Sequence, residues 1–214
     1  IDGQCSEEES SESESSESEC NWIMWFITRR GNELYCQVDE AYIKDDFNMT
    51  GLPSVVTEYK RAMDTILDNY FPTDNITEAR LQAIDDSAEL LYGLIHARYI
   101  LTTEGMNRMR AKYNHVHFGR CPRAFCEGQP VLPVGLSDIP FNYAVSVFCP
   151  KCLEVYHPRS TRQSTVDGAF FGTTFCHLFL LAHLELIPAK TPDTYVPRVF
   201  GYRINKDSEY YKKR

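Results

Sequence analysis

Four cysteines in two close pairs constrain this 214-residue chain more than any other feature of its sequence. Cys121 and Cys126 form the first pair, Cys149 and Cys152 form the second, and 22 residues separate the pairs. Four thiolates are soft ligands that suit a tetrahedral zinc ion. The stretch AVSVFC before Cys149 is typical of a strand, so the two pairs predict a zinc ribbon. One structural zinc per chain would fill all four ligand positions and leave none for a substrate.

Other uses of these thiols fit the sequence less well. Eight cysteines in 214 residues lie far below the density of a small secreted disulfide scaffold. No stretch approaches the roughly 20 apolar residues of a membrane span, and no signal-peptide core is visible. We therefore expect a reducing location, cytoplasm and nucleus, and no membrane partner. A single redox Cys-x-x-Cys would not explain the second pair.

The remaining cysteines and two histidines are not expected to extend the metal site. Cys36 and Cys176 lie among apolar residues and are predicted to be core, whereas Cys5 and Cys20 flank a polar segment. Two histidines could in principle compete as ligands, but neither has the spacing of a zinc knuckle: His157 and His177.

The charge of the chain is concentrated at its start. Residues 1–19 hold eight acids and no Lys or Arg, which leaves 22 acids against 22 bases in the rest. A neutral body argues against a nucleic-acid partner. Residues 1–20 contain mostly Ser and Glu and are predicted to be a disordered acidic arm. The plain interpretation is a solvating arm; the functional one is a set of phosphoacceptors, each with Glu three residues later: Ser6, Ser11 and Ser16.

Residues 21–117 are predicted to form an α-helical domain. An apolar anchor at Trp22–Phe26 precedes expected helices over 38–47, 54–71, 77–102 and 103–115. In the third helix, His96 is expected to be a buried structural histidine rather than a catalytic one. Its neighbour Arg98 is expected to pair with an acid, because an unpaired buried charge is costly.

The ribbon region carries more apolar residues than a domain of its size needs internally, which indicates a protein–protein interface. Near the end of the chain, PRVFGYRI alternates and predicts a strand with Phe200 and Tyr202 on one side. These aromatics are either interface anchors on a hairpin or a cap on the ribbon's own core, and the residues leave both open. The chain shows no phosphate-binding glycine loop, no Ser nucleophile motif and no His-Glu-x-x-His.

Several long sequence motifs in this chain resemble those of a known protein family. The chain closely resembles the regulatory beta subunit of casein kinase II in these segments: RGNELYCQVDEAYIKDDFNMTGL, LYGLIHARYILT, FGRCP, LPVGLSDIP, FCPKC and DGAFFGTTF. The resemblance implies a homodimer formed through the ribbons, with one kinase catalytic subunit bound at each C-terminal region. It also implies a subunit without catalysis of its own that stabilises the kinase and alters its choice of substrates. Phe200 and Tyr202 match the family's kinase-contacting aromatic pair, and the four cysteines match its zinc ligands.

These observations predict an α+β chain with four parts. They are a disordered arm (1–20), an all-α domain (21–117), a zinc-ribbon dimerisation domain with a few antiparallel strands (118–190) and an extended partner-binding hairpin or tail (191–214). The alternatives are a zinc-ribbon nucleic-acid or transcription-associated protein, an enzyme, and a beta-like paralogue with weakened kinase binding. The neutral body disfavours the first, and the closed metal site disfavours the second.

Overall fold

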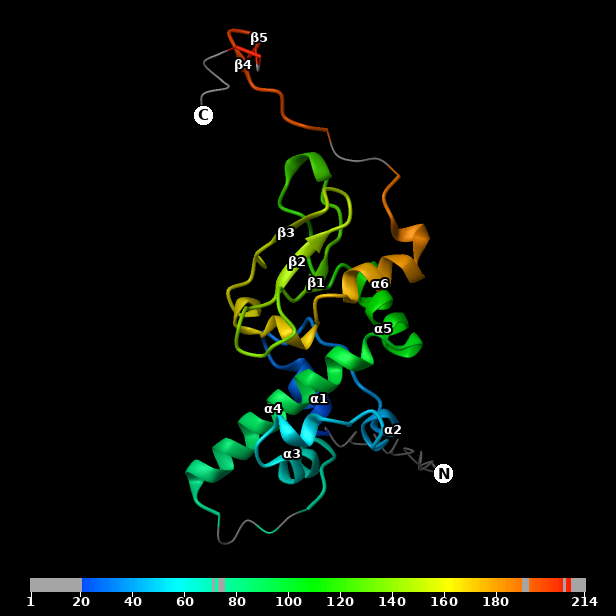
Figure 1. Cartoon of the computed structure of the whole chain (residues 1–214), viewed down its shortest axis with the longest axis vertical. Coiled ribbons are helices and arrows are strands. Elements are labelled where there is room, and N and C mark those ends of the chain that lie inside the picture. The colour runs from blue at the N-terminus through cyan, green and yellow to red at the C-terminus, as the bar shows by residue number, and fades with distance from the viewer. Residues whose placement is uncertain (1–20, 71, 73–75, 190–192, 206, 209–214) are drawn as a thin grey trace, which may run out of the picture.

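The computed structural model describes residues 21–208 except 71, 73–75, 190–192 and 206. Helices fill the first half of this range, and a three-stranded antiparallel sheet and a separate two-stranded hairpin follow (Figure 1). The predicted α+β class is confirmed. No helix among the described residues has the length and apolarity that crossing a bilayer would need.

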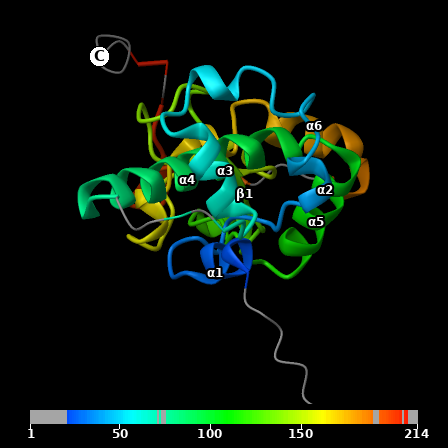
Figure 2. The ribbon, with the colours of Figure 1, turned by 90° about the horizontal axis from the view of Figure 1, so that it is seen from below.

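The helical half is built around one long helix. Its elements are α1 (Trp22–Thr28), α2 (Glu40–Ile43), the 3₁₀ turn η1 (Leu52–Ser54), α3 (Tyr59–Ile66), α4 (Glu78–Tyr99) and α5 (Thr103–Asn114). Figures 1 and 2 show α4 at the centre, with α1 and α3 beside it and α5 continuing from its end. The apolar pattern of α4 explains its place, because Leu91, Tyr92 and Ile95 are all fully buried.

Two of the predicted helices are shorter than the sequence pattern suggests. The helix expected over 38–47 covers only Glu40–Ile43, and Phe47 is 84% exposed instead of joining its packed face. The helix expected over 54–71 begins at Tyr59, because Glu58 before it has a left-handed backbone with φ of 49°. Ser54, the first residue of the expected helix, instead ends η1, and its hydroxyl donates to the Gly51 carbonyl at 2.7 Å.

His96 has the structural role that the sequence predicts. Its side chain is fully buried on α4, with Nδ1 2.8 Å from the Phe170 carbonyl oxygen and Nε2 accepting from the Cys36 amide at 3.1 Å. Burial lowers the pKa of His96 to about 4, so the imidazole is neutral. The ring thereby ties α4 to two distant segments of the chain.

Arg98 differs from its prediction. Its guanidinium donates to the carbonyl oxygens of Asn48 and Thr50, at 2.6 and 3.0 Å, and pairs with no acid among the described residues. These two carbonyl oxygens lie in the turns between α2 and η1, so backbone acceptors take the place of the expected carboxylate partner.

The second half contains the sheet and short helical turns. Strands β1 (Leu132–Val134), β2 (Ser146–Cys149) and β3 (Glu154–Tyr156) pair antiparallel in that order. Leu132 pairs with Phe148, and Phe148 pairs in turn with Val155. The other elements are η2 (Ala124–Cys126), η3 (Gln163–Thr165), η4 (Gly168–Phe170), α6 (Phe175–Ala182) and η5 (Leu184–Leu186).

The hydrophobic core runs without a break from the helices into the sheet. Gly93 on α4 makes the contact possible, because a Cβ there would lie 2.4 Å from the Phe170 ring of η4. Of the ribbon residues expected at an interface, five are instead buried in this core: Val131, Leu132, Val134, Val145 and Val147. Leu136, Ile139 and Phe141 are exposed. The surplus of apolar residues is therefore smaller than the sequence suggested, because the sheet also packs against the helices.

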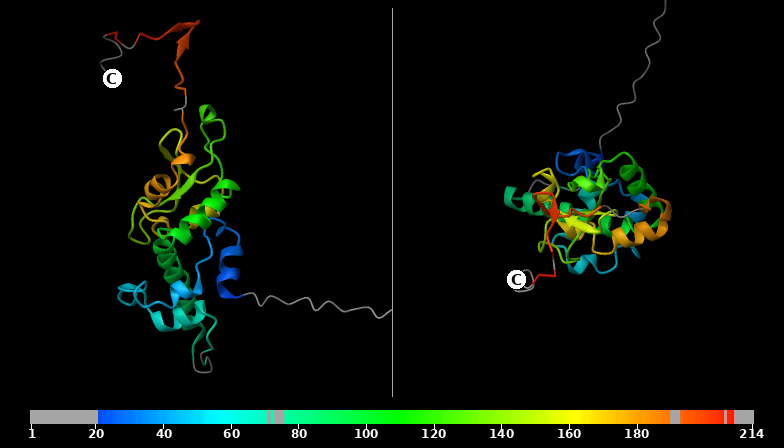
Figure 3. Two further views of the ribbon diagram at one scale, coloured as in Figure 1. Left: turned by 90° about the vertical axis from the view of Figure 1, so that its right-hand side faces the viewer. Right: turned by 90° about the horizontal axis from the view of Figure 1, so that it is seen from above.

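The last described segment is a small hairpin of β4 (Arg198–Val199) and β5 (Tyr202–Arg203). Figures 1 and 3 show it standing apart from the rest of the molecule. Phe200 and Gly201 form its turn with positive φ of 49° and 86°, as a two-residue hairpin turn requires. The prediction that Phe200 and Tyr202 share one strand is therefore wrong, since Phe200 lies in the turn and Tyr202 in β5.

Candidate metal centre

The first cysteine pair lies on a compact turn before β1. The Cys121 amide donates to the Gln129 carbonyl at 2.8 Å, and the Cys126 amide donates to the Arg123 carbonyl at 3.0 Å. Glu127, directly after η2, turns the chain with a left-handed φ of 54°. These bonds fold the four intervening residues so that both sulfurs face the same point.

The second pair lies where β2 turns into β3. Cys149 is the last residue of β2, and Cys152 follows in the turn. The Leu153 amide donates to the Cys149 carbonyl at 2.9 Å, and Leu153 itself has a φ of 58°. Pairing of β2 with both neighbouring strands brings this turn against the first one.

The four sulfurs form one cluster. Sγ of Cys121 lies 3.9 Å from Sγ of Cys152, and Sγ of Cys149 lies 4.0 Å from Sγ of Cys126. All four sulfurs lie within 4.8 Å of one another. A tetrahedral ion with Zn–S bonds of about 2.3 Å needs sulfurs separated by about 3.8 Å. The four cysteines could therefore hold a metal ion, and their number and softness fit zinc.

The surroundings of three of the thiols give them different pKa values. Burial raises the pKa of Cys126, and it raises the pKa of Cys149 to about 11. Burial also opposes ionisation of Cys152, but hydrogen bonds from the Tyr156 hydroxyl and the Glu154 amide outweigh it and lower its pKa to about 7. Cys152 is also the one member of the cluster that is not fully buried.

Two contacts beside the cluster were not predicted from the sequence. The Tyr156 hydroxyl lies 3.3 Å from Sγ of Cys152, and Lys151 between the paired cysteines forms an ion pair with Glu127 at 2.9 Å. The second contact joins the two turns across the cluster. The four-residue spacing from Cys152 to Tyr156 places the hydroxyl there only because β3 folds back on β2.

The remaining candidate residues lie elsewhere. Cys36 and Cys176 are buried in apolar surroundings, as predicted, and burial raises the pKa of both thiols. Among the described residues, neither His157 nor His177 joins the cysteine cluster. Cys5, Cys20 and the three candidate phosphoacceptors fall outside the described residues: Ser6, Ser11 and Ser16.

The aromatic pair near the C-terminus is exposed. Phe200 is 97% exposed and Tyr202 is 80% exposed, on the hairpin that stands apart from the body (Figure 3). They do not cap the core of the ribbon. The structure thus brings the four cysteines together and keeps the two aromatics separate from them.

Comparison with known proteins gives a consistent result. The family model for the casein kinase II regulatory subunit matches residues 21–203. A putative casein kinase II subunit beta-4 from Arabidopsis thaliana is 49% identical over 206 residues, covering 96% of this chain and 73% of the relative. Casein kinase II subunit beta from Dictyostelium discoideum is 48% identical, covering 95% and 74%. The subunit beta of Schizosaccharomyces pombe is 46% identical, covering 90% and 83%.

Proposed function

This chain belongs to the casein kinase II regulatory subunit family and is a non-catalytic subunit, and we propose that it joins two kinase catalytic subunits in one assembly. In this proposal the chain binds zinc, forms a homodimer, holds one catalytic subunit at each hairpin and changes which substrates the kinase selects. The zinc, the dimer and the kinase contact each rest on a separate part of the described structure.

The proposed metal is one structural zinc per chain, held by the thiolates of Cys121, Cys126, Cys149 and Cys152. The support is the sulfur cluster, whose spacing matches tetrahedral thiolate coordination. The ion would join the two turns, which the ion pair between Lys151 and Glu127 also links. Metal binding would therefore contribute directly to folding of the ribbon.

The proposed dimer interface is the surface around this cluster. Three apolar side chains next to the cysteines are exposed to solvent: Phe125, Leu153 and Val155. Phe125 lies on η2 within the first turn, and Leu153 follows Cys152 directly. A second copy that covered these side chains would bury apolar area on a surface that the metal keeps rigid.

The exposed aromatics of the hairpin carry the proposal of kinase binding. Exposed Tyr and Phe side chains often act as anchors at protein interfaces, because each buries a large area at a small cost in side-chain entropy. Phe200 and Tyr202 contribute nothing to the core of this chain, so their place on a hairpin is explained by a partner that buries them. The family match supports the catalytic subunit as that partner.

The acidic arm and the location of the protein complete the proposal. Serines with Glu three residues later suit a kinase with a basic substrate groove, so the bound kinase would phosphorylate the arm. Substrates are the further partners, and the assembly would work in the cytoplasm and the nucleus.

Size-exclusion chromatography with light scattering tests this function. The zinc-loaded chain, mixed with an equal amount of casein kinase II catalytic subunit, is expected to elute with the mass of two copies of each. A dimer that elutes apart from the kinase would instead fit a beta-like paralogue with weakened binding. A monomeric chain that does not bind the kinase would contradict the proposal.

A further inference from the structure

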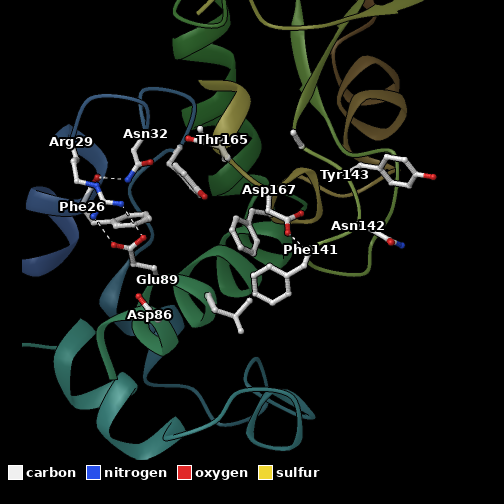
Figure 4. A pocket seen from close by; sticks show the side chains of 15 residues that line it. Phe26, Arg29, Asn32, Asp86, Glu89, Phe141, Asn142, Tyr143, Thr165 and Asp167 are labelled. Carbon is white, nitrogen blue, oxygen red and sulfur yellow. Dashed lines mark hydrogen bonds and ion pairs between the residues drawn. The ribbon is translucent and has the colours of Figure 1, made fainter. Parts of the chain in front are cut away.

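A cleft lies between the helical half and the ribbon half, apart from the cysteine cluster and the hairpin. It has a volume of about 680 Å³. Its walls come from α1, α4, the loop over 141–144 and the segment over 165–170 (Figure 4). The proposed zinc and kinase sites make no use of it.

Phe141 at the edge of this cleft has an unusual backbone and an unusual exposure. Its φ is 65°, in the left-handed region that is costly for residues with a side chain. Its amide donates to the Asp167 carboxylate, which fixes the loop, yet its ring is 83% exposed. Glycine would adopt this backbone without strain, so the fold gains nothing from an aromatic ring here.

The floor of the cleft is apolar and aromatic. Phe26 and Tyr35 are buried there and contact each other with ring centroids 5.3 Å apart. Phe170 and Leu90 complete the floor. An apolar side chain of moderate size would find a preformed surface between this floor and the Phe141 ring.

The α4 wall is acidic. Glu89 is neutralised by a two-bond ion pair with Arg29, but Asp86 accepts only an amide hydrogen bond from Gln82 among the described contacts. Asp85, the neighbouring residue on α4, lines an adjacent hollow instead, and burial, followed by the charges of Asp86 and Glu89, raises its pKa. Negative charge on this wall therefore exceeds what its neighbours compensate, and Figure 4 shows Asp86 and Phe141 among the side chains that line the cleft.

We propose that this cleft docks a short extended segment of a partner protein that carries a Lys or Arg beside an apolar side chain. The cation pairs with Asp86 and lies near the Phe141 ring, where cation–π attraction adds to the ion pair. The apolar side chain packs on the Phe26 floor. Contact with the partner accounts for an exposed ring on a strained backbone. The docking site goes beyond the proposed function, because it needs neither the metal nor the kinase.

Selection from a random heptapeptide phage library tests the site. The zinc-loaded chain serves as target and its Phe141→Gly variant as counter-target, since glycine relieves the left-handed strain and keeps the fold. Enriched peptides are expected to carry Lys or Arg next to an aliphatic or aromatic residue. The best peptide is then synthesised and titrated by fluorescence anisotropy. Phe141→Gly should weaken its binding about tenfold and Asp86→Asn about fivefold.

Matched variants separate this site from general surface effects. Phe47→Ala removes an equally exposed ring from the helical half, and Glu78→Gln removes an acid from the first turn of α4; both should bind like the unmodified chain. A peptide with Glu in place of its basic residue should bind weakly and recover on the Asp86→Lys variant.

Three results would overturn the proposal. One is enrichment of peptides without Lys or Arg. Another is unchanged binding by Phe141→Gly or Asp86→Asn. The third is a change in oligomeric state in Phe141→Gly, seen by light scattering, because a second copy of this chain would then be what covers the cleft.

Discussion

Replacing both hairpin aromatics with alanine separates kinase binding from every other property of the chain. In the free protein, Phe200 and Tyr202 are almost fully exposed, so their removal takes no side chain out of the core. The free energy of unfolding should change by no more than about 0.5 kcal/mol, as is usual for surface substitutions. Zinc content and dimerisation should not change, because the four sulfurs lie elsewhere.

The effect on the complex is expected to be large. An aromatic anchor buried at the centre of an interface contributes about 2 kcal/mol or more on truncation. Two such anchors give about 4 kcal/mol if they act independently, which corresponds to an affinity about a thousandfold weaker. Calorimetric titration of the Phe200→Ala, Tyr202→Ala chain against the casein kinase II catalytic subunit measures this directly.

The chain offers a matched control for this experiment. Phe47 and Tyr70 are also a Phe and a Tyr, 84% and 90% exposed, in the helical half. Their double alanine variant should bind the kinase like the unmodified chain. The reasoning is refuted if the hairpin variant binds as tightly as the unmodified chain, or if both double variants lose the same affinity.

Three other outcomes are expected. Cys149→Ser should release the zinc and yield monomers, measured by elemental analysis and light scattering; a zinc-free variant that remains a stoichiometric dimer would contradict the site. His96, with a pKa of about 4 in the fold and 6.5 when unfolded, binds its proton more readily in the unfolded chain. Stability from this group is complete above pH 6.5 and falls by about 3 kcal/mol as the pH approaches 4; urea unfolding should show this slope, and His96→Gln should flatten it. Incubation with the catalytic subunit and ATP should phosphorylate the arm before the folded body, at Ser6, Ser11 or Ser16. Mass spectrometry that finds no phosphate before Trp22 would exclude this.

Features that depend on neighbouring residues were predicted well from the sequence. The cysteine pairs have short spacings, so each turn can present two sulfurs whatever the rest of the chain does. The long α4 also follows from its own pattern, because an apolar stripe that is continuous over many turns has to be buried. The buried, hydrogen-bonded role of His96 followed from its position on that helix.

Features that depend on distant contacts required the tertiary structure. Alternation around Phe200 predicts one strand, but pairing of Val199 with Tyr202 forces a turn between them. Arg98 finds carbonyl oxygens 48 to 50 residues away, and periodicity carries no information about such partners. The cleft beside Phe141 exists only because the ribbon loop folds against α1 and α4. The sequence alone therefore determined the two cysteine turns and the main helix, since both arise within a few turns of chain. The tertiary structure decided which side chains remain exposed, because exposure depends on what the rest of the chain covers.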